Sequence, residues 1–264
     1  MLITVLITTK NEEKNMEELL KSLIIQEKPI EIIIVDAGST DNTTTIIKNY
    51  AQKYPFIKLY NKEGTRGESM NYGIERAQGE AISFLGADDR ADKDWIRYVR
   101  QSLKKRHDIV VGKCILVGNK KFSLDRVNLY HRGVDISYPG SNTTYRKKIL
   151  DEIGGFDPKF ITAEDIDLNY RAVDAGYNIY ENEKAIVYRR VRSNVIEFLK
   201  QSFWNGYGRR QLVSKYGSMW SGYKISTFKK QFTLWGLFRL IFGSIGYLCC
   251  KIREVFDNLS HHGQ

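Results

Sequence analysis

Two adjacent carboxylates, those of Asp88 and Asp89, follow an apolar run from Ala81 to Leu85. The run predicts a strand buried on both faces, and open α/β sheets bind ligands at the carboxyl ends of their strands. Neighbouring carboxylates repel each other unless a cation lies between them, and Mg2+ and Mn2+ take such oxygen ligands together with substrate phosphates. The pair therefore indicates a metal–diphosphate site. The alternative is that these acids cap a helix that begins near Trp95.

Polar residues also follow the other predicted strands. The first strand, Leu2 to Thr8, leads into Thr9 to Glu13, and the second, Ile30 to Val35, ends at Asp36. An acid at the end of the second strand can bind a ribose hydroxyl or a base edge in a nucleotide site. The chain has no G-x-G-x-x-G after the first strand and no G-x-x-x-x-G-K-[ST]. A dinucleotide dehydrogenase and a P-loop NTPase are therefore not expected.

The elements that would position these residues alternate between strands and helices. Apolar positions at helical spacing follow the first and second strands, and Phe56 to Tyr60 is a third, shorter strand. Alternation of this kind requires crossover connections and predicts a mostly parallel sheet. Further elements are expected as a helix from Asn71 to Ala77, a helix after Asp89 that runs to about Arg106, a strand or strand pair over Ile109–Val117, a helix over Lys147–Ile153 and a helix opened by the acids at 164, 165 and 167.

Five motifs occur in an order that resembles an inverting family 2 glycosyltransferase with the GT-A fold. They are Thr8-Thr9-Lys10-Asn11-Glu12, Val35-Asp36-Ala37-Gly38-Ser39-Thr40-Asp41, the stretch from Gly67 to Glu80, Gly154-Gly155-Phe156-Asp157, and Glu164-Asp165-Ile166-Asp167-Leu168 with Arg171. Any one of these motifs alone would be weak evidence. The resemblance covers roughly Leu2 to Arg210.

The resemblance implies an α/β fold with a GT-A-type, Rossmann-like, mostly parallel sheet flanked by helices. Residues 1–190 would form the catalytic domain, with a nucleotide-binding half of about 1–90 and an acceptor half of about 91–190. Asp165 would be the catalytic base, and Asp88 with Asp89 would hold Mn2+ or Mg2+. The residues implied for nucleotide-sugar binding are Thr9, Asn11, Glu12, Asp36, Arg66, Asn71, Asp88, Glu164 and Arg189. For Arg66 the alternative is a solvated loop arginine, and for the acids from Glu164 to Asp167 it is a favourable interaction with the helix dipole.

Two departures from the family pattern bear on the metal. Gly86 stands where the family's D-x-D motif has its first Asp, and the segment from Ala185 to Arg190 lacks the His that many relatives carry there. Arg189 or Arg190 could instead neutralise the diphosphate directly, by charge-assisted hydrogen bonds. Metal dependence is therefore expected less firmly than the fold.

The C-terminal region, residues 191–264, is basic. It holds eleven Lys and Arg against three Asp and Glu, a net charge of +8 out of +10 for the whole chain. Helical spacing predicts a helix from Asn194 to Lys215, whose basic and aromatic middle either closes over the diphosphate or the acceptor, or packs on the sheet. Because the basic residues alternate with apolar ones, the composition favours an anionic membrane surface over nucleic acid as the partner.

The segment from Phe232 to Cys250 has one charged residue, Arg239, in nineteen positions, which is near the minimum for a membrane span. Lys229 and Lys230 precede it, and further basic residues follow it, so a span would leave one cluster on the unfavourable side. The pattern favours an interfacial helix. The alternative is a helix docked on the catalytic domain or on a second subunit. Three cysteines and no signal sequence indicate a cytoplasmic protein bound peripherally to the inner face of the cell membrane.

The predicted activity is transfer of a sugar from a UDP- or GDP-sugar donor to an acceptor hydroxyl, with inversion, on a glycan or polyprenyl-linked acceptor. One alternative is transfer onto polyprenyl phosphate itself. Alternatives from other classes are a sugar-phosphate nucleotidyltransferase, which would need a Gly-rich loop that Thr9 to Glu13 does not provide, and a non-catalytic nucleotide-sugar binding module.

Overall fold

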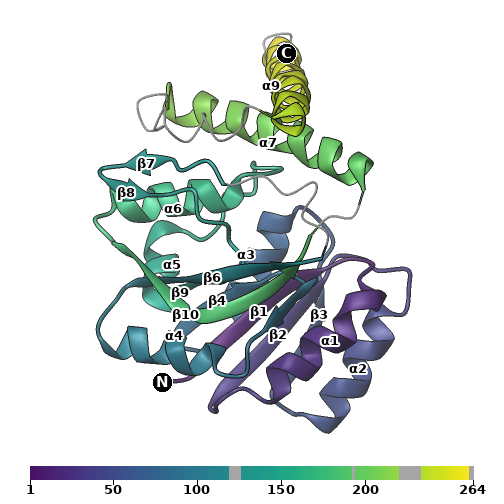
Figure 1. Ribbon diagram of the computed structural model, residues 1–264, viewed down its shortest axis with the longest axis vertical. Helices are drawn as coiled ribbons and strands as arrows, with labels where there is room; N and C mark the ends of the chain where they lie inside the picture. The colour runs from purple at the N-terminus through teal and green to yellow at the C-terminus, as the bar shows by residue number, and fades with distance from the viewer. Residues whose placement is uncertain (119–125, 192–193, 220–232, 262–264) are drawn as a thin grey trace.

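The computed structural model describes residues 1–118, 126–191, 194–219 and 233–261. Its centre is an eight-stranded sheet with the strand order β3-β2-β1-β4-β9-β6-β10-β5, flanked by helices (Figure 1). A separate two-stranded ribbon, β7 and β8, lies beside it. The mixed α/β architecture expected from the sequence is confirmed.

The first half of the chain forms the parallel part of the sheet. Strand β1 pairs in parallel with β2 and β4, and β2 pairs in parallel with β3. Strands β1, β2 and β4 are mostly apolar and almost entirely buried, as expected for strands covered on both faces. The elements are β1 (Ile3–Thr9), α1 (Glu13–Ile24), β2 (Ile30–Asp36), α2 (Thr43–Lys53), β3 (Ile57–Asn61), α3 (Arg66–Arg76) and β4 (Ala81–Leu85).

The second half extends the sheet with two antiparallel strands among the parallel ones. Strand β9 runs antiparallel to β4 and β6, and β5 runs antiparallel to β10, while β10 and β6 are parallel. The elements are β5 (Asp89–Ala91), α4 (Trp95–Lys104), β6 (Ile109–Val117), β7 (Tyr130–His131), β8 (Val134–Asp135), β9 (Thr143–Arg146), α5 (Lys147–Ile153), α6 (Glu164–Asp174) and β10 (Ile179–Arg190).

Two helix starts differ from the sequence-based expectation. Helix α4 begins at Trp95, after Asp94, so neither Asp88 nor Asp89 caps it. Asp89 instead begins β5, where it lies opposite Arg189 of β10. Helix α3 begins earlier than predicted, at Arg66, because Thr65 and Glu68 form a reciprocal capping box.

The C-terminal region forms two helices, α7 (Val195–Tyr216) and α9 (Leu234–His261), which pack on each other at one end of the molecule (Figure 1). They approach closely at glycines: a Cβ added to Gly206 would come within 1.8 Å of the Gly243 carbonyl oxygen. Gly243 and Gly246 of α9 therefore face α7. Lys229, Lys230 and Phe232, which flank or begin the predicted apolar segment, lie outside the described residues.

Candidate active site

The parallel register brings three polar strand ends to one edge of the sheet. Thr9 at the end of β1 lies opposite Asp36 at the end of β2, and Ile7 lies opposite Leu85, the last residue of β4. The hydroxyl of Thr9 is buried and has no hydrogen-bond partner among the described residues. An unpaired buried hydroxyl costs free energy, so this position favours a ligand that bonds to it.

Asp36 shapes the turn that follows β2. Its carboxylate accepts hydrogen bonds from the Gly38 amide at 3.1 Å, from the Ser39 amide at 2.9 Å and from the Ser39 hydroxyl at 2.5 Å. A cavity of about 270 Å³ opens beside this turn, between α2 and the end of β3, with Asp36 in its lining. A larger cavity of about 620 Å³, lined by Glu80, Arg146 and neighbouring residues, lies at the opposite edge of the sheet, away from these acids.

Asn11 and Glu12 join the loop after β1 to the turn after β2. Asn11, which has a left-handed φ of 56°, accepts from the Thr40 amide at 2.8 Å, and the Glu12 amide donates to the Thr43 hydroxyl at 2.8 Å. Burial raises the pKa of the Glu12 carboxyl, and the nearby charges of Asp88 and Asp41 raise it further. The loop therefore presents a half-buried acid next to Asp88.

Asp88 and Asp89 have different surroundings. Asp88 is exposed and makes no hydrogen bond or ion pair with the described residues. The Asp89 side chain is fully buried and pairs with Arg189, whose Nε lies 3.0 Å from its Oδ1. It also accepts from the Gly86 amide at 2.8 Å and from the Ser141 hydroxyl. A Cβ on residue 86 would come within 2.8 Å of the Asp88 carboxylate and 3.0 Å of the Asp89 carboxylate, so a side chain at this position would displace one or both acids.

The donor set at this edge fits a cation held by one protein carboxylate. Among the described residues, no group of three or more His, Cys, Asp or Glu side chains gathers at one point. Asp89 is committed to Arg189, which leaves Asp88 as the available ligand of the predicted pair. Mg2+ and Mn2+ fit such a site when water and substrate phosphate oxygens supply the remaining ligands. Arg189 stays protonated beside the buried Asp89, because pairing with this acid keeps the pKa of its guanidinium high although burial opposes this.

A second pair of acids opens α6. The Asp165 carboxylate is half-buried and accepts from the Gly140 amide at 2.9 Å. The Glu164 side chain is buried and lies 3.4 Å from Arg66 at the start of α3. Burial raises the pKa of Glu164, the charge of Asp165 raises it further, and Arg66 partly offsets both effects.

The turn before β9 connects the two acidic sites. Gly140 contacts Asp165, and its neighbour Ser141 contacts Asp89 and lies 3.3 Å from the Gly86 amide. The sequence predicted no site residue in this segment. Its polar run from Gly140 to Asn142 was visible, but nothing local indicated that it would lie between acids 52 and 25 positions away.

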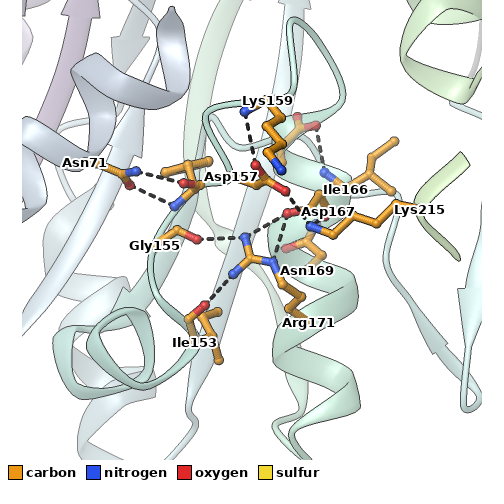
Figure 2. Close-up of polar contacts among 12 residues, drawn as sticks. Asn71, Ile153, Gly155, Asp157, Lys159, Ile166, Asp167, Asn169, Arg171 and Lys215 are labelled. Atoms are coloured by element: carbon orange, nitrogen blue, oxygen red, sulfur yellow. Dashed lines mark hydrogen bonds and ion pairs between the residues drawn. The ribbon is translucent and has the colours of Figure 1, made fainter. Parts of the chain in front are cut away.

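Asn71 supports the site from behind. Its side chain donates to the Phe156 carbonyl at 2.7 Å and accepts from the Phe156 amide at 2.8 Å. Arg171 donates to the carbonyls of Ile153 and Gly155, and its guanidinium pairs with Asp167 at 2.8 Å (Figure 2). The predicted binding residue Asn71 is therefore committed to holding the Gly-Gly-Phe-Asp loop.

A mostly parallel α/β sheet with acids at its strand ends, facing a second carboxylate at a helix start, defines a protein of the GT-A type. The family model described as Glycosyl transferase family 2 matches residues 4–162. The chain belongs to this family of glycosyltransferases.

Curated relatives are consistent with this assignment. The chain is 28% identical to the probable glycosyltransferase YdaM of Bacillus subtilis over 201 residues, which is 67% of this chain and 48% of that protein. It thus spans about half the length of that relative. It is 26% identical, over 81% of this chain and 74% of the other, to a Methanococcus voltae dolichyl N-acetyl-alpha-D-glucosaminyl phosphate 3-beta-D-2,3-diacetamido-2,3-dideoxy-beta-D-glucuronosyltransferase. A poly-beta-1,6-N-acetyl-D-glucosamine synthase of Staphylococcus epidermidis is 27% identical over 86% of this chain and 59% of its own.

Two solved structures share the fold. Residues 1–349 of S. aureus TarS in complex with UDP-GlcNAc superpose with a TM-score of 0.61 and 21% identity, over 81% of this chain and 73% of that one. The mannosyltransferase PcManGT from Pyrobaculum calidifontis, in complex with GDP-Man and Mn2+, gives a TM-score of 0.65 at 18% identity, over 95% of this chain and 75% of that one.

Proposed function

We propose that this protein transfers a sugar from a nucleoside-diphosphate donor to an acceptor hydroxyl in a single displacement that inverts the anomeric carbon. The observation that carries the proposal is that two neighbouring residues, Gly140 and Ser141, link the acid at the start of α6 to the acids after β4. Asp88 is uncommitted next to Asp89, Asp89 contacts Ser141, and Gly140 contacts Asp165. One acid thus faces the leaving group while another faces the attacking hydroxyl.

The nucleoside binds at the ends of β1 and β2. The Thr9 hydroxyl, which lacks a partner among the described residues, bonds to the nucleoside. Asn11, Glu12 and Asp36 form the wall of this subsite, because their contacts fix the two loops that border it. The chemistry of the wall suits a ribose and a base edge, since carboxylates and carbonyls accept hydrogen bonds from both.

The diphosphate lies at the end of β4. Asp88 would hold Mn2+ or Mg2+, and stabilisation of the charge that grows on the leaving diphosphate is the chemistry such an ion supplies. Mn2+ in the PcManGT complex supports this assignment. Arg189 contributes from the protein, because a quarter of its side chain is exposed beside Asp89 and can face the phosphates. Arg66 and Glu164 border the sugar, and the positive charge of Arg66 compensates the carboxylate of Glu164.

Asp165 acts as the general base. Its carboxylate takes the proton of the acceptor hydroxyl as that oxygen attacks the anomeric carbon, and the diphosphate leaves from the opposite face. The Gly140 amide donates to one carboxylate oxygen at 2.9 Å and the Ile166 amide donates to the other at 2.8 Å, so the group is oriented. Each oxygen keeps a second lone pair that can accept the proton. No covalent sugar–enzyme intermediate is needed. Asp165→Asn should lower kcat by about 10²–10⁴-fold while the nucleotide still binds.

The acceptor is a glycan or a polyprenyl-linked glycan at the inner face of the cell membrane. Relatives named for dolichyl phosphate and polysaccharide substrates support this class. Helix α9 is long and apolar enough to cross a membrane by length and composition. However, α7 packs against its middle and carries Arg210, which pairs with Glu254 at 2.5 Å, so a span would draw charged residues of α7 into the hydrocarbon. The helix pair therefore lies in the interface, with the catalytic domain in the cytoplasm.

The test uses thermal shift and calorimetry on the full chain with UDP, GDP, CDP and their sugars, each with Mn2+, Mg2+ or EDTA. Selective stabilisation by one nucleotide, followed by release of that nucleoside diphosphate from its sugar, is expected. Stabilisation that ignores EDTA would move the diphosphate onto Arg189. A folded protein that binds one nucleotide sugar without ever releasing the nucleoside diphosphate would favour the non-catalytic binding module, and one that responds to no nucleotide would overturn the proposal.

A further inference from the structure

Helix α7 is attached to the loop that leads into Asp165. Gln211 accepts from the Ile161 amide at 3.2 Å and donates to the Lys159 carbonyl at 2.9 Å. Three positions earlier on the helix, Gly208 lies so close that an added Cβ would come within 2.8 Å of the Ala163 Cβ. The last two turns of α7 therefore cover the loop without any intervening element.

Two side chains at the end of α7 reach the buried carboxylate of Asp167. Lys215 Nζ lies 2.7 Å from Asp167 Oδ1 and 2.7 Å from Asp157 Oδ2 (Figure 2). The Tyr216 hydroxyl donates to the same Asp167 oxygen at 2.6 Å, and its ring stacks on Tyr170 of α6 at 3.9 Å. The Asp167 side chain is fully buried, so its charge depends on these partners together with Arg171.

The start of α6 needs such support because its own capping is weak. Ala163, which precedes the helix, has a left-handed φ of 62°, and no side chain caps the first turn. A non-glycine residue in this conformation is held only when its surroundings impose it. Asp165 is two residues further on, in the same turn as Asp167. The amides of Gly140 and Ile166 hold the Asp165 carboxylate, and the contacts of Asp167 hold the helical turn that carries it.

We infer that Lys215, assisted by Tyr216, is a positioning residue for the catalytic base, acting through Asp167 and Asp157. The inference rests on the proposed role of Asp165. Loss of the ammonium leaves Asp167 with Arg171 and Tyr216 and leaves Asp157 with the Lys159 amide, so the loop and the first turn of α6 shift. A displacement of about 1 Å at the base is sufficient to lower the rate by up to about 100-fold. The nucleotide subsite at β1 and β2 does not contact Lys215 and keeps its affinity.

The experiment measures release of nucleoside diphosphate from the donor sugar selected above, with kcat and KM, and calorimetric binding of the nucleotide alone. The variants are Lys215→Met, Lys215→Arg, Tyr216→Phe and the control Lys200→Met, which removes an exposed lysine from the same helix. Lys215→Met is expected to lower kcat by about 10–100-fold with nucleotide Kd within about twofold, and Lys215→Arg to recover part of the rate. Lys200→Met is expected to match the wild-type protein.

Asp165→Asn in the same assay separates the two claims. If Asp165→Asn retains activity, the proposed function fails. If it is inactive while Lys215→Met and Tyr216→Phe match Lys200→Met, the positioning role is overturned and the function stands. Should Lys215→Met fail to fold, Tyr216→Phe, which deletes one hydroxyl and keeps the ring, decides the matter. If kcat, nucleotide affinity and Tm all fall together in these variants, the inference is also overturned, because that result would indicate a purely structural role.

Discussion

At the scale of single residues, Arg189 gives two neighbouring acids different roles, because it pairs with Asp89 and not with Asp88. Arg189 neutralises Asp89, which is buried, and Asp89 in turn organises the Gly86 amide and Ser141. Asp88 is exposed and has no partner among the described residues, so its charge is available to a cation. The two substitutions to asparagine should therefore have different consequences.

Asp88→Asn should weaken Mn2+-dependent nucleotide binding while changing the free energy of unfolding by less than about 0.5 kcal/mol, as is usual for exposed positions. Asp89→Asn should mainly destabilise the fold. Removing one partner of a fully buried pair costs roughly 3–5 kcal/mol, and the cost here is smaller because a quarter of Arg189 is exposed. Calorimetry with and without Mn2+, and urea unfolding, measure the two effects. Equal unfolding free energies for both variants would contradict this division.

Glu164 gives the stability a defined pH dependence. Its pKa is raised above the ordinary 4.5 by burial and by Asp165, so folding favours the protonated form. As pH rises from about 4.5 through the raised folded pKa, the unfolded chain loses the proton first, and the contribution of this group to stability falls. Glu164→Gln should therefore gain stability relative to the wild-type protein across that window. Urea unfolding from pH 4 to 8 measures the difference, and a gap that narrows as pH rises would disprove the sign.

At the scale of elements, apolar runs were sufficient to predict β4 and β6 at their observed bounds, together with the strand ends that carry Thr9 and Asp36. These features depend on residues close in sequence. The pairing of Asp89 with Arg189 joins positions 100 residues apart, and Asn71 meets Phe156 across 85. The residues next to Asp89 or Asn71 in the sequence do not indicate such contacts. The sequence therefore left a helix cap open for Asp89 and predicted a ligand contact for Asn71.

The pairing of α7 with α9 depends on one close contact. Gly206→Ala would place a methyl group 1.8 Å from the Gly243 carbonyl, so the helices must separate. The variant should lose about 1–3 kcal/mol of the packing between these helices, as overpacked cores typically do, and α9 should become sensitive to limited proteolysis. Nucleotide affinity should be unchanged, because the proposed nucleoside subsite is at the ends of β1 and β2, which neither glycine contacts. Asn205→Ala, at the exposed neighbouring position, is the matched control. An α9 that stays equally protected in both variants would argue against this packing.

At the scale of the whole molecule, the exposed apolar surface and the proposed active site, at the ends of β1, β2 and β4, belong to different parts of the chain. Helix α9 exposes large apolar side chains along most of its described length, while its glycines face α7. The exposed residues on α9 are Leu234, Leu237, Phe238, Leu240, Ile241, Ile245, Leu248, Ile252, Val255 and Phe256. A surface of this kind, in a region with a net charge of +8, is complementary to an anionic bilayer.

Binding to vesicles of anionic and neutral lipid should therefore depend both on the exposed apolar side chains of α9 and on the positive charge of the C-terminal region. The protein should bind the anionic vesicles more tightly, and salt should reduce the difference, because screening acts on the charges and not on apolar burial. Replacing Leu237, Leu240 and Leu248 by serine removes three side chains that are 54%, 66% and 56% exposed. At about 1.5–3 kcal/mol for each fully buried leucine, binding should weaken by at least about 100-fold. Sedimentation with vesicles measures the change.

Ile25→Ser is the control for this experiment, since Ile25 is 63% exposed and directly follows α1, away from α9. It should leave vesicle binding unchanged. The alternative is that a second copy of the chain covers the apolar face of α9, and light scattering of the unmodified protein tests this by measuring its oligomeric state. A stable dimer that ignores vesicles, and that the triple substitution converts to a monomer, would assign the face to a second copy of the chain. Vesicle binding by a monomer would instead place the catalytic edge near the membrane surface, where a polyprenyl-linked acceptor presents its glycan.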